Sequence, residues 1–157
     1  MPPITRSAFP QSSMSLVWLA VVAALQSDPI LHSAVDTWQV WSNKEIDTAE
    51  PTDEDLPIVR ITPAGGQGMW LDEGAHQLTW NIKIEIGCEG TDITNVLDFW
   101  QAIFTPLFNG NILLNTLYPY GVIQKTMSTA GVTPRMFGEK TGLGSEGLLT
   151  IKMRINS

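Results

Sequence analysis

Few residues of this chain are of the types that catalyse reactions or bind metals. The only histidines are His32 and His76, and the only cysteine is Cys88. A zinc site built from these three side chains would need carboxylate ligands as well. Cys88 falls on the apolar side of an alternating segment, which favours a structural thiol over a nucleophile paired with histidine. We therefore expect no catalytic residue, no metal site and no cofactor, and we expect that the protein is not an enzyme.

Two glycine-containing segments superficially match phosphate-binding motifs. Residues 142–147 (GLGSEG) fit the G-x-G-x-x-G pattern of dinucleotide sites. That motif works between a strand and the N-terminus of a helix, whereas here a strand pattern follows and Glu146 would repel phosphate. Residues 138–141 (GEKT) lack the glycine directly before the lysine that a phosphate-binding loop requires. We expect residues 138–147 to form a turn-rich loop.

The charge of the chain is acidic and unevenly distributed. The formal net charge is −7, and no run of lysine or arginine exists, which argues against a nucleic-acid-binding protein. Residues 44–55 contribute five of the seven net charges, and their spacing lacks the glycine-bearing pattern of a calcium-binding EF-hand. This segment is predicted to be a solvated loop, or a surface that repels an anion or meets a basic partner. The candidate residues for such a channel or partner face are Glu45, Asp47, Asp53, Glu54 and Asp55.

The N-terminal part combines an arm with an apolar segment. Residues 1–12 hold three prolines and are predicted to be an extended arm, ahead of a single α+β domain over 13–157. The apolar run 14–25 is shorter than the ~20 residues that span a bilayer. An alternative is a signal-peptide core behind Arg6, but one basic residue is a weak n-region. The pattern favours a buried or interface helix.

Hydrophobic periodicity predicts the remaining elements. Between residues 77 and 88, apolar side chains from Leu78 to Cys88 alternate with polar ones, as in a half-buried antiparallel strand. Helices are predicted over about 14–26 and about 92–108, and strands over 37–41, 56–62, 77–88 and 148–156, with short strands around 112–117 and 121–126. The predicted fold is α+β, with a mostly antiparallel sheet packed against two main helices.

Some features indicate contacts with other protein molecules. Residues 63–68 (PAGGQG) are predicted to be a flexible loop followed by an apolar tip at 69–71. The chain has six tryptophans, a residue type enriched at the centres of interfaces. The candidate subunit-contact residues are Ile4, Phe9, Trp18, Gln67, Met69 and Trp70.

The order of these elements is distinctive. An apolar helix ends in LQSDPIL (25–31), a strand of LPIVRITP type follows (56–63), and the strand HQLTWNIKIEIGCEG (76–90) leads into the helix TDITNVLDFWQAIFTPLF (91–108). This order resembles that of the tail terminator, or tail-completion, proteins of tailed bacteriophages. The resemblance covers about residues 13–108.

The resemblance implies a structural protein of the virion, located in the tail or neck and made in the host cytoplasm. It implies a homo-hexameric ring that caps the tail tube, stops its polymerisation and takes part in head–tail joining. The implied partners are the tail tube protein and a connector or head-completion protein, without a membrane. Phage DNA would pass through an acidic channel without specific binding. The alternatives are another virion component, such as a head–tail connector, tail tube or baseplate protein, or a small ligand-binding or enzymatic domain.

Overall fold

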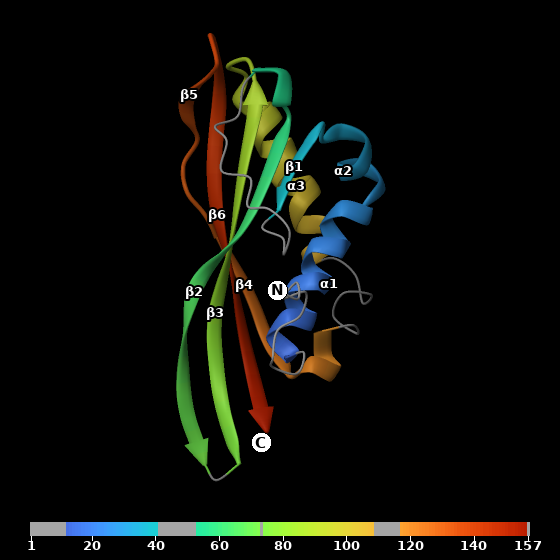
Figure 1. Ribbon diagram of the computed structural model, residues 1–157. Helices are drawn as coiled ribbons and strands as arrows, with labels where there is room; N and C mark the ends of the chain where they lie inside the picture. Colours follow the sequence, from blue (N-terminus) through green and yellow to red (C-terminus); the bar gives the residue numbers. More distant parts are fainter. Residues whose placement is uncertain (1–11, 41–52, 73, 109–116, 157) are drawn as a thin grey trace, which may run out of the picture.

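The chain folds into a sheet with helices packed on one face. The computed structural model describes residues 12–40, 53–72, 74–108 and 117–156. In this part, a six-stranded sheet lies against three α-helices, which all cover the same face of the sheet (Figure 1). The strands pair antiparallel except for one parallel pair at an edge. The predicted fold class, α+β with a mostly antiparallel sheet, is confirmed.

The helical layer begins with two helices that share a capping residue. The three helices are α1 (Ser13–Ser27), α2 (Pro29–Ala34) and α3 (Ile93–Phe108). Asp28 ends α1 and also caps α2, since its carboxylate accepts a hydrogen bond from the Leu31 backbone N–H at 3.1 Å. The next residue, Pro29, needs no backbone partner at the first position of a helix. The chain therefore turns between α1 and α2 at Asp28, which caps the ends of both helices.

The sheet has the order β1-β2-β3-β6-β4, and β5 pairs with β6 beyond the end of β4. The strands are β1 (Thr37–Val40), β2 (Ile58–Asp72), β3 (Ala75–Glu89), β4 (Val122–Thr129), β5 (Thr133–Phe137) and β6 (Lys140–Asn156), and the short 3₁₀ helices are η1 (Asp53–Asp55) and η2 (Tyr118–Tyr120). The strand expected around residues 112–117 falls almost entirely outside the described residues. The long strands β2, β3 and β6 form the centre of the sheet.

Strand register separates an inner face, toward the helices, from an outer face. On the inner side of β3, Ile82 and Ile84 are fully buried, and they lie opposite Leu149 and Gly147 of β6. The intervening residues Lys83 and Glu85 lie on the outer face, where they are partly exposed. The alternation predicted for this strand is confirmed. A shift of one residue would move two charged side chains into the core, so the hydrophobic pattern fixes the register.

The prediction of a loop over residues 63–68 is wrong, because strand β2 continues through these residues to Asp72. The pairing of β2 with β3 shifts between Pro63 and Gly66, and the extra residue Gly65 has φ +89°. A Cβ atom on Gly66 would lie 2.5 Å from the Cβ of Trp80 on β3. The glycines therefore allow a bulge and a close approach of the two strands, and they do not form a turn.

The prediction of a turn-rich loop over residues 138–147 is also wrong for most of its length, because strand β6 begins at Lys140. A Cβ on Gly142 would lie 2.8 Å from the Phe137 ring, and a Cβ on Gly147 would lie 3.0 Å from the Trp100 ring. These glycines leave room for aromatic rings on opposite faces of one strand. Glycine in a strand can mark a close approach instead of a turn.

Helix α3 buries a narrower face than its sequence predicted. The buried side chains on it are Val96, Trp100, Ile103 and Leu107. The helical spacing of the apolar residues in the sequence would also place Ile93 and Leu97 on this face, but they are 53% and 56% exposed. Only one stripe of a helix can face a flat sheet, and these two residues lie beside that stripe. They remain on the surface as an apolar pair one turn apart.

The Trp100 side chain ties α3 to the sheet through a buried hydrogen bond. Its indole Nε1–H donates to the Ser145 hydroxyl at 3.0 Å, and that hydroxyl donates to the Ala130 carbonyl oxygen at 3.2 Å. Ser145→Ala should lower the free energy of unfolding by about 1–3 kcal/mol, because a buried N–H would lose its acceptor. Urea unfolding would measure this loss.

A matched control for that substitution lies on the outer face. Thr150 donates to the Asn81 side-chain oxygen at 2.8 Å, but both residues are only half-buried. Water can replace this bond, so Thr150→Ala should cost at most about 0.5 kcal/mol. Equal losses for the two substitutions would contradict a stabilising role for the Trp100–Ser145 bond.

Candidate functional site

The structure describes only the end of the acidic segment 44–55. Glu45 and Asp47 lie outside the described residues, and the backbone of Asp53 opens η1. Glu54 is exposed and Asp55 is half-buried in the same 3₁₀ turn, directly before β2. Of the described carboxylates, Glu54 thus lies at the surface and Asp55 lies partly beneath it.

The candidate subunit-contact residues do not form one cluster. Gln67 and Met69 lie on β2 and are exposed, Met69 by 56%. Trp18 is half-buried on α1 and packs against the core. The backbone of Trp70 belongs to β2, and Ile4 and Phe9 lie outside the described residues. The structure therefore brings together only the candidates on β2.

Gln67 and Met69 belong to a hairpin, made by β2 and β3, that extends past the helical layer (Figure 1). The inner side of this hairpin carries an open groove of about 390 Å³. The groove is lined mainly by apolar atoms, and its lining residues are Met14, Pro63, Gly65, Gly66, Gln67, Gly68, Leu78, Thr79 and Trp80. It exists because two inward positions of β2 are glycines and because α1 begins only at Ser13.

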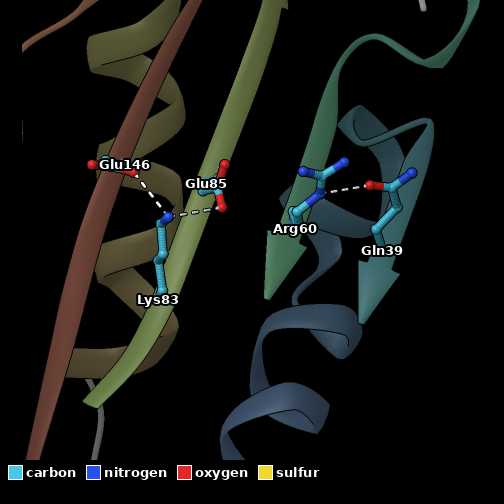
Figure 2. A network of polar contacts seen from close by, with 5 residues as sticks. All are labelled: Gln39, Arg60, Lys83, Glu85 and Glu146. Carbon is cyan, nitrogen blue, oxygen red and sulfur yellow. Dashed lines mark hydrogen bonds and ion pairs between the residues drawn. The ribbon is translucent and has the colours of Figure 1, made fainter. Parts of the chain in front are cut away.

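The outer face of the sheet carries a small polar network. Figure 2 shows Lys83 of β3 between Glu85 on the same strand and Glu146 on β6. Its Nζ lies 3.3 Å from a Glu85 oxygen and 3.2 Å from a Glu146 oxygen. Beside this group, the Arg60 Nε–H donates to the Gln39 side-chain oxygen at 2.7 Å. The Lys83 group thus links β3 with β6, and the Arg60 hydrogen bond links β2 with β1.

The chemistry of this network is that of a solvated surface. The hydrogen bond with Glu146 raises the pKa of Lys83, so the amine stays protonated and cannot act as a base near neutral pH. Charges of both signs lie on this face: the described cations include Arg60, Lys83, Lys152 and Arg154, and the described anions include Glu85 and Glu146. Sequence reasoning missed the contact of Lys83 with Glu146, since it requires the β3–β6 register.

Two free edges of the sheet lie at the same level. Among the described residues, β1 pairs with β2 only over Ile58–Ile61, so Thr62–Asp72 have no partner strand on that side. At the other edge, β4 pairs only with β6 in the described part. Successive pairs connect 66–68 of β2 through β3 and β6 to 122–125 of β4. Unpaired backbone groups at such edges are templates for pairing with another chain.

These two edges have opposite strand directions. Strand β3 runs antiparallel to β2, β6 antiparallel to β3, and β4 antiparallel to β6. β4 therefore runs opposite to β2. If a second copy lay beside the first in the same orientation, its β4 edge would meet the β2 edge of the first as an antiparallel pair.

The helical layer also exposes apolar side chains. Ile30 of α2 is 65% exposed, and Leu19 of α1 is 53% exposed. With Ile93 and Leu97 on α3, each helix presents at least one large apolar residue to the surface. Single exposed apolar residues are ordinary on a protein surface, whereas contiguous apolar patches are typical of protein–protein contact surfaces.

The Cys88 thiol is enclosed in the core. Burial raises its pKa from 9.0 to about 11, and the side chain is 5% exposed. The folded protein should therefore react with a thiol reagent at pH 8 at least 10-fold more slowly than the urea-unfolded chain, because thiolate is the reactive species. Because the folded pKa is raised, stability should fall as pH rises from about 9 toward 11. Equal labelling rates in the two states would contradict this placement.

The described residues contain no group of three or more histidine, cysteine or acidic side chains that could hold a metal ion. Within the same described ranges, no helix is long and apolar enough to cross a membrane. Comparison of the chain with protein-family models and with curated proteins finds no match to either.

Proposed function

We propose that this chain is a structural protein of a phage virion, of the tail terminator type. In this proposal, copies form a ring that needs no cofactor and has six subunits, as the resemblance implies. The ring caps the tail tube and stops its growth. The ring joins the tail to the head through a connector or head-completion protein. Its acidic segment around Glu54 and Asp55 faces the DNA path and repels phosphate, so that DNA passes without being bound.

The pair of free, oppositely directed edges is the observation that carries this proposal. A contact between two different surfaces of identical copies is head-to-tail, and such contacts either close into rings or extend into filaments. The two edges lie at the same level of the sheet, so a rotation about an axis roughly parallel to the strands brings them together. Closure then removes both edges from each copy.

Two further observations support a structural role. The exposed apolar residues on α1, α2 and α3 offer a second contact surface for tail proteins. The polar network on the outer face consists of mutually paired charges and carries no group poised for catalysis. Both features favour assembly over an enzymatic reaction.

Tail length in particles assembled without this chain tests the proposed function. If the chain ends polymerisation, its absence should give tail tubes of uncontrolled length that are not joined to heads, as seen by electron microscopy. Tubes of normal length that remain separate from heads would instead identify a connector. A complete lack of tubes would identify a tube or baseplate component.

A further inference from the structure

The groove on the inner side of the β2–β3 hairpin is a docking site whose occupant can be inferred. At two inward positions of β2 no side chain enters it, because Gly66 and Gly68 lie opposite Trp80 and Leu78. We propose that the N-terminal arm of the same chain folds back into this groove and places the Phe9 ring against Leu78 and Trp80. This inference goes beyond the proposed function, since it concerns a contact within one chain and does not require a ring.

The position of the groove favours the arm as its occupant. Met14, in the first turn of α1, is one of the lining residues, and the described chain begins two residues earlier at Ser12. The chain outside the described part at this end is residues 1–11. Phe9 is three residues before Ser12, so its Cα can lie at most about 11 Å from that of Ser12. The arm thus starts at the mouth of the groove and has the length to enter it.

The chemistry of the arm matches that of the groove. Phe9 is the one aromatic residue of the sequence MPPITRSAFPQ, and Pro10 directly follows it. A residue before proline is biased toward extended backbone, and proline-containing segments of this kind bind to grooves lined by aromatic side chains. Trp80 provides such a side chain here. The volume of about 390 Å³ lies within the range of pockets that hold small organic groups.

Effective concentration favours the arm of the same chain over the arm of a neighbour. A short tether keeps Phe9 near its own groove at an effective concentration on the order of millimolar. The arm of a second copy would reach comparable occupancy only inside an assembly. Insertion of Phe9 would also cover Leu78, which is only half-buried.

Photocrosslinking from position 9 in the full chain tests this inference. A p-benzoylphenylalanine at position 9 keeps the aromatic character of the residue, and a matched control carries the same group at position 7, in place of Ser7. A mixture of isotopically heavy and light protein shows whether a crosslink joins one chain or two. After irradiation, position 9 should crosslink to Met14, to residues 65–68 or to residues 78–80 within one chain, at a yield at least 5-fold above that of position 7.

A groove-filling variant provides a second measurement. A Cβ on Gly68 would meet only the Leu78 Cδ2 atom, at 3.3 Å, so Gly68→Leu directs a side chain into the groove with little displacement. This variant should lower the crosslink yield from position 9 several-fold. Crosslinks between heavy and light chains would overturn the inference in favour of a neighbour's arm. No crosslink above the control, or a yield unaffected by Gly68→Leu, would show that Phe9 does not occupy the groove.

Discussion

Chains with cysteines at Gln67 and Gln124 should join into covalent oligomers under mild oxidation. Both side chains are exposed on the outer face, one at the free edge of β2 and the other on β4. Residues that face each other on adjacent antiparallel strands have Cβ atoms about 4.5–5.5 Å apart, close enough for a disulfide after small adjustments. A non-reducing gel should show a ladder of bands that ends at the number of subunits in the ring.

The controls for this experiment follow from the head-to-tail geometry. Each single cysteine variant can form at most a dimer, since one chain then offers one reactive thiol while Cys88 stays buried. Because the strand register between copies is set by the assembly, Thr126→Cys and Ser128→Cys should be tested with Gln67→Cys in the same way. If no combination gives more than dimers, the two edges do not meet.

Replacement of Gly121 by alanine adds only one methyl group, but it should destabilise the fold strongly. Gly121 has φ +88°, and an added Cβ would lie 2.3 Å from the Arg154 carbonyl oxygen. Gly121 also accepts a hydrogen bond from the Arg154 backbone N–H at 2.8 Å, so neither strand can move away freely. Strain and overpacking together should cost about 2–5 kcal/mol. Thermal or urea unfolding would measure the cost.

Alanine substitutions at two other glycines distinguish the cost of backbone strain from the cost of overpacking. Gly90 has φ +81° with nothing within 4 Å of an added Cβ, so Gly90→Ala should cost only the backbone strain of about 1–2 kcal/mol. For Gly131 nothing lies within 4 Å and φ is not positive, so Gly131→Ala should change stability by at most about 0.5 kcal/mol. A Gly121→Ala loss no larger than that of Gly90→Ala would contradict the close contact with Arg154.

The strongest predictions from the sequence came from segments where one physical signal dominates. In β3, the alternation from Leu78 to Cys88 fixes which residues face the helices, because one face is buried and the other is solvated. The end of α1 at Asp28 and Pro29 follows from local capping chemistry alone. Such signals require no knowledge of distant residues.

Glycine was interpreted wrongly because its role depended on partners far away in the sequence. In β2 and β6, glycines suggested loops, yet Gly66 accommodates Trp80 and Gly142 accommodates Phe137. Whether a glycine forms a turn or allows a close approach depends on the residue placed against it by strand pairing. That partner cannot be identified before the register is known.

The candidate surfaces depended on tertiary structure in the same way. Sequence reasoning selected Gln67 and Met69 as contact residues but expected them in a loop and its tip. They lie instead on a strand edge that has no partner strand among the described residues. The level and direction of the β4 edge follow only from the pairing of β6 with both β3 and β4. The groove at Leu78 likewise arises from the end of α1 and the glycines of β2.

Native mass spectrometry of the purified chain, alone and mixed with the tail tube protein, tests the central claim most directly. The proposal predicts one closed species of defined subunit number, with six copies as the expected value, and no open series of sizes. Negative-stain images of the same sample should show rings. A chain that stays monomeric at all concentrations, also with tube protein present, would contradict a role as a ring-forming tail protein.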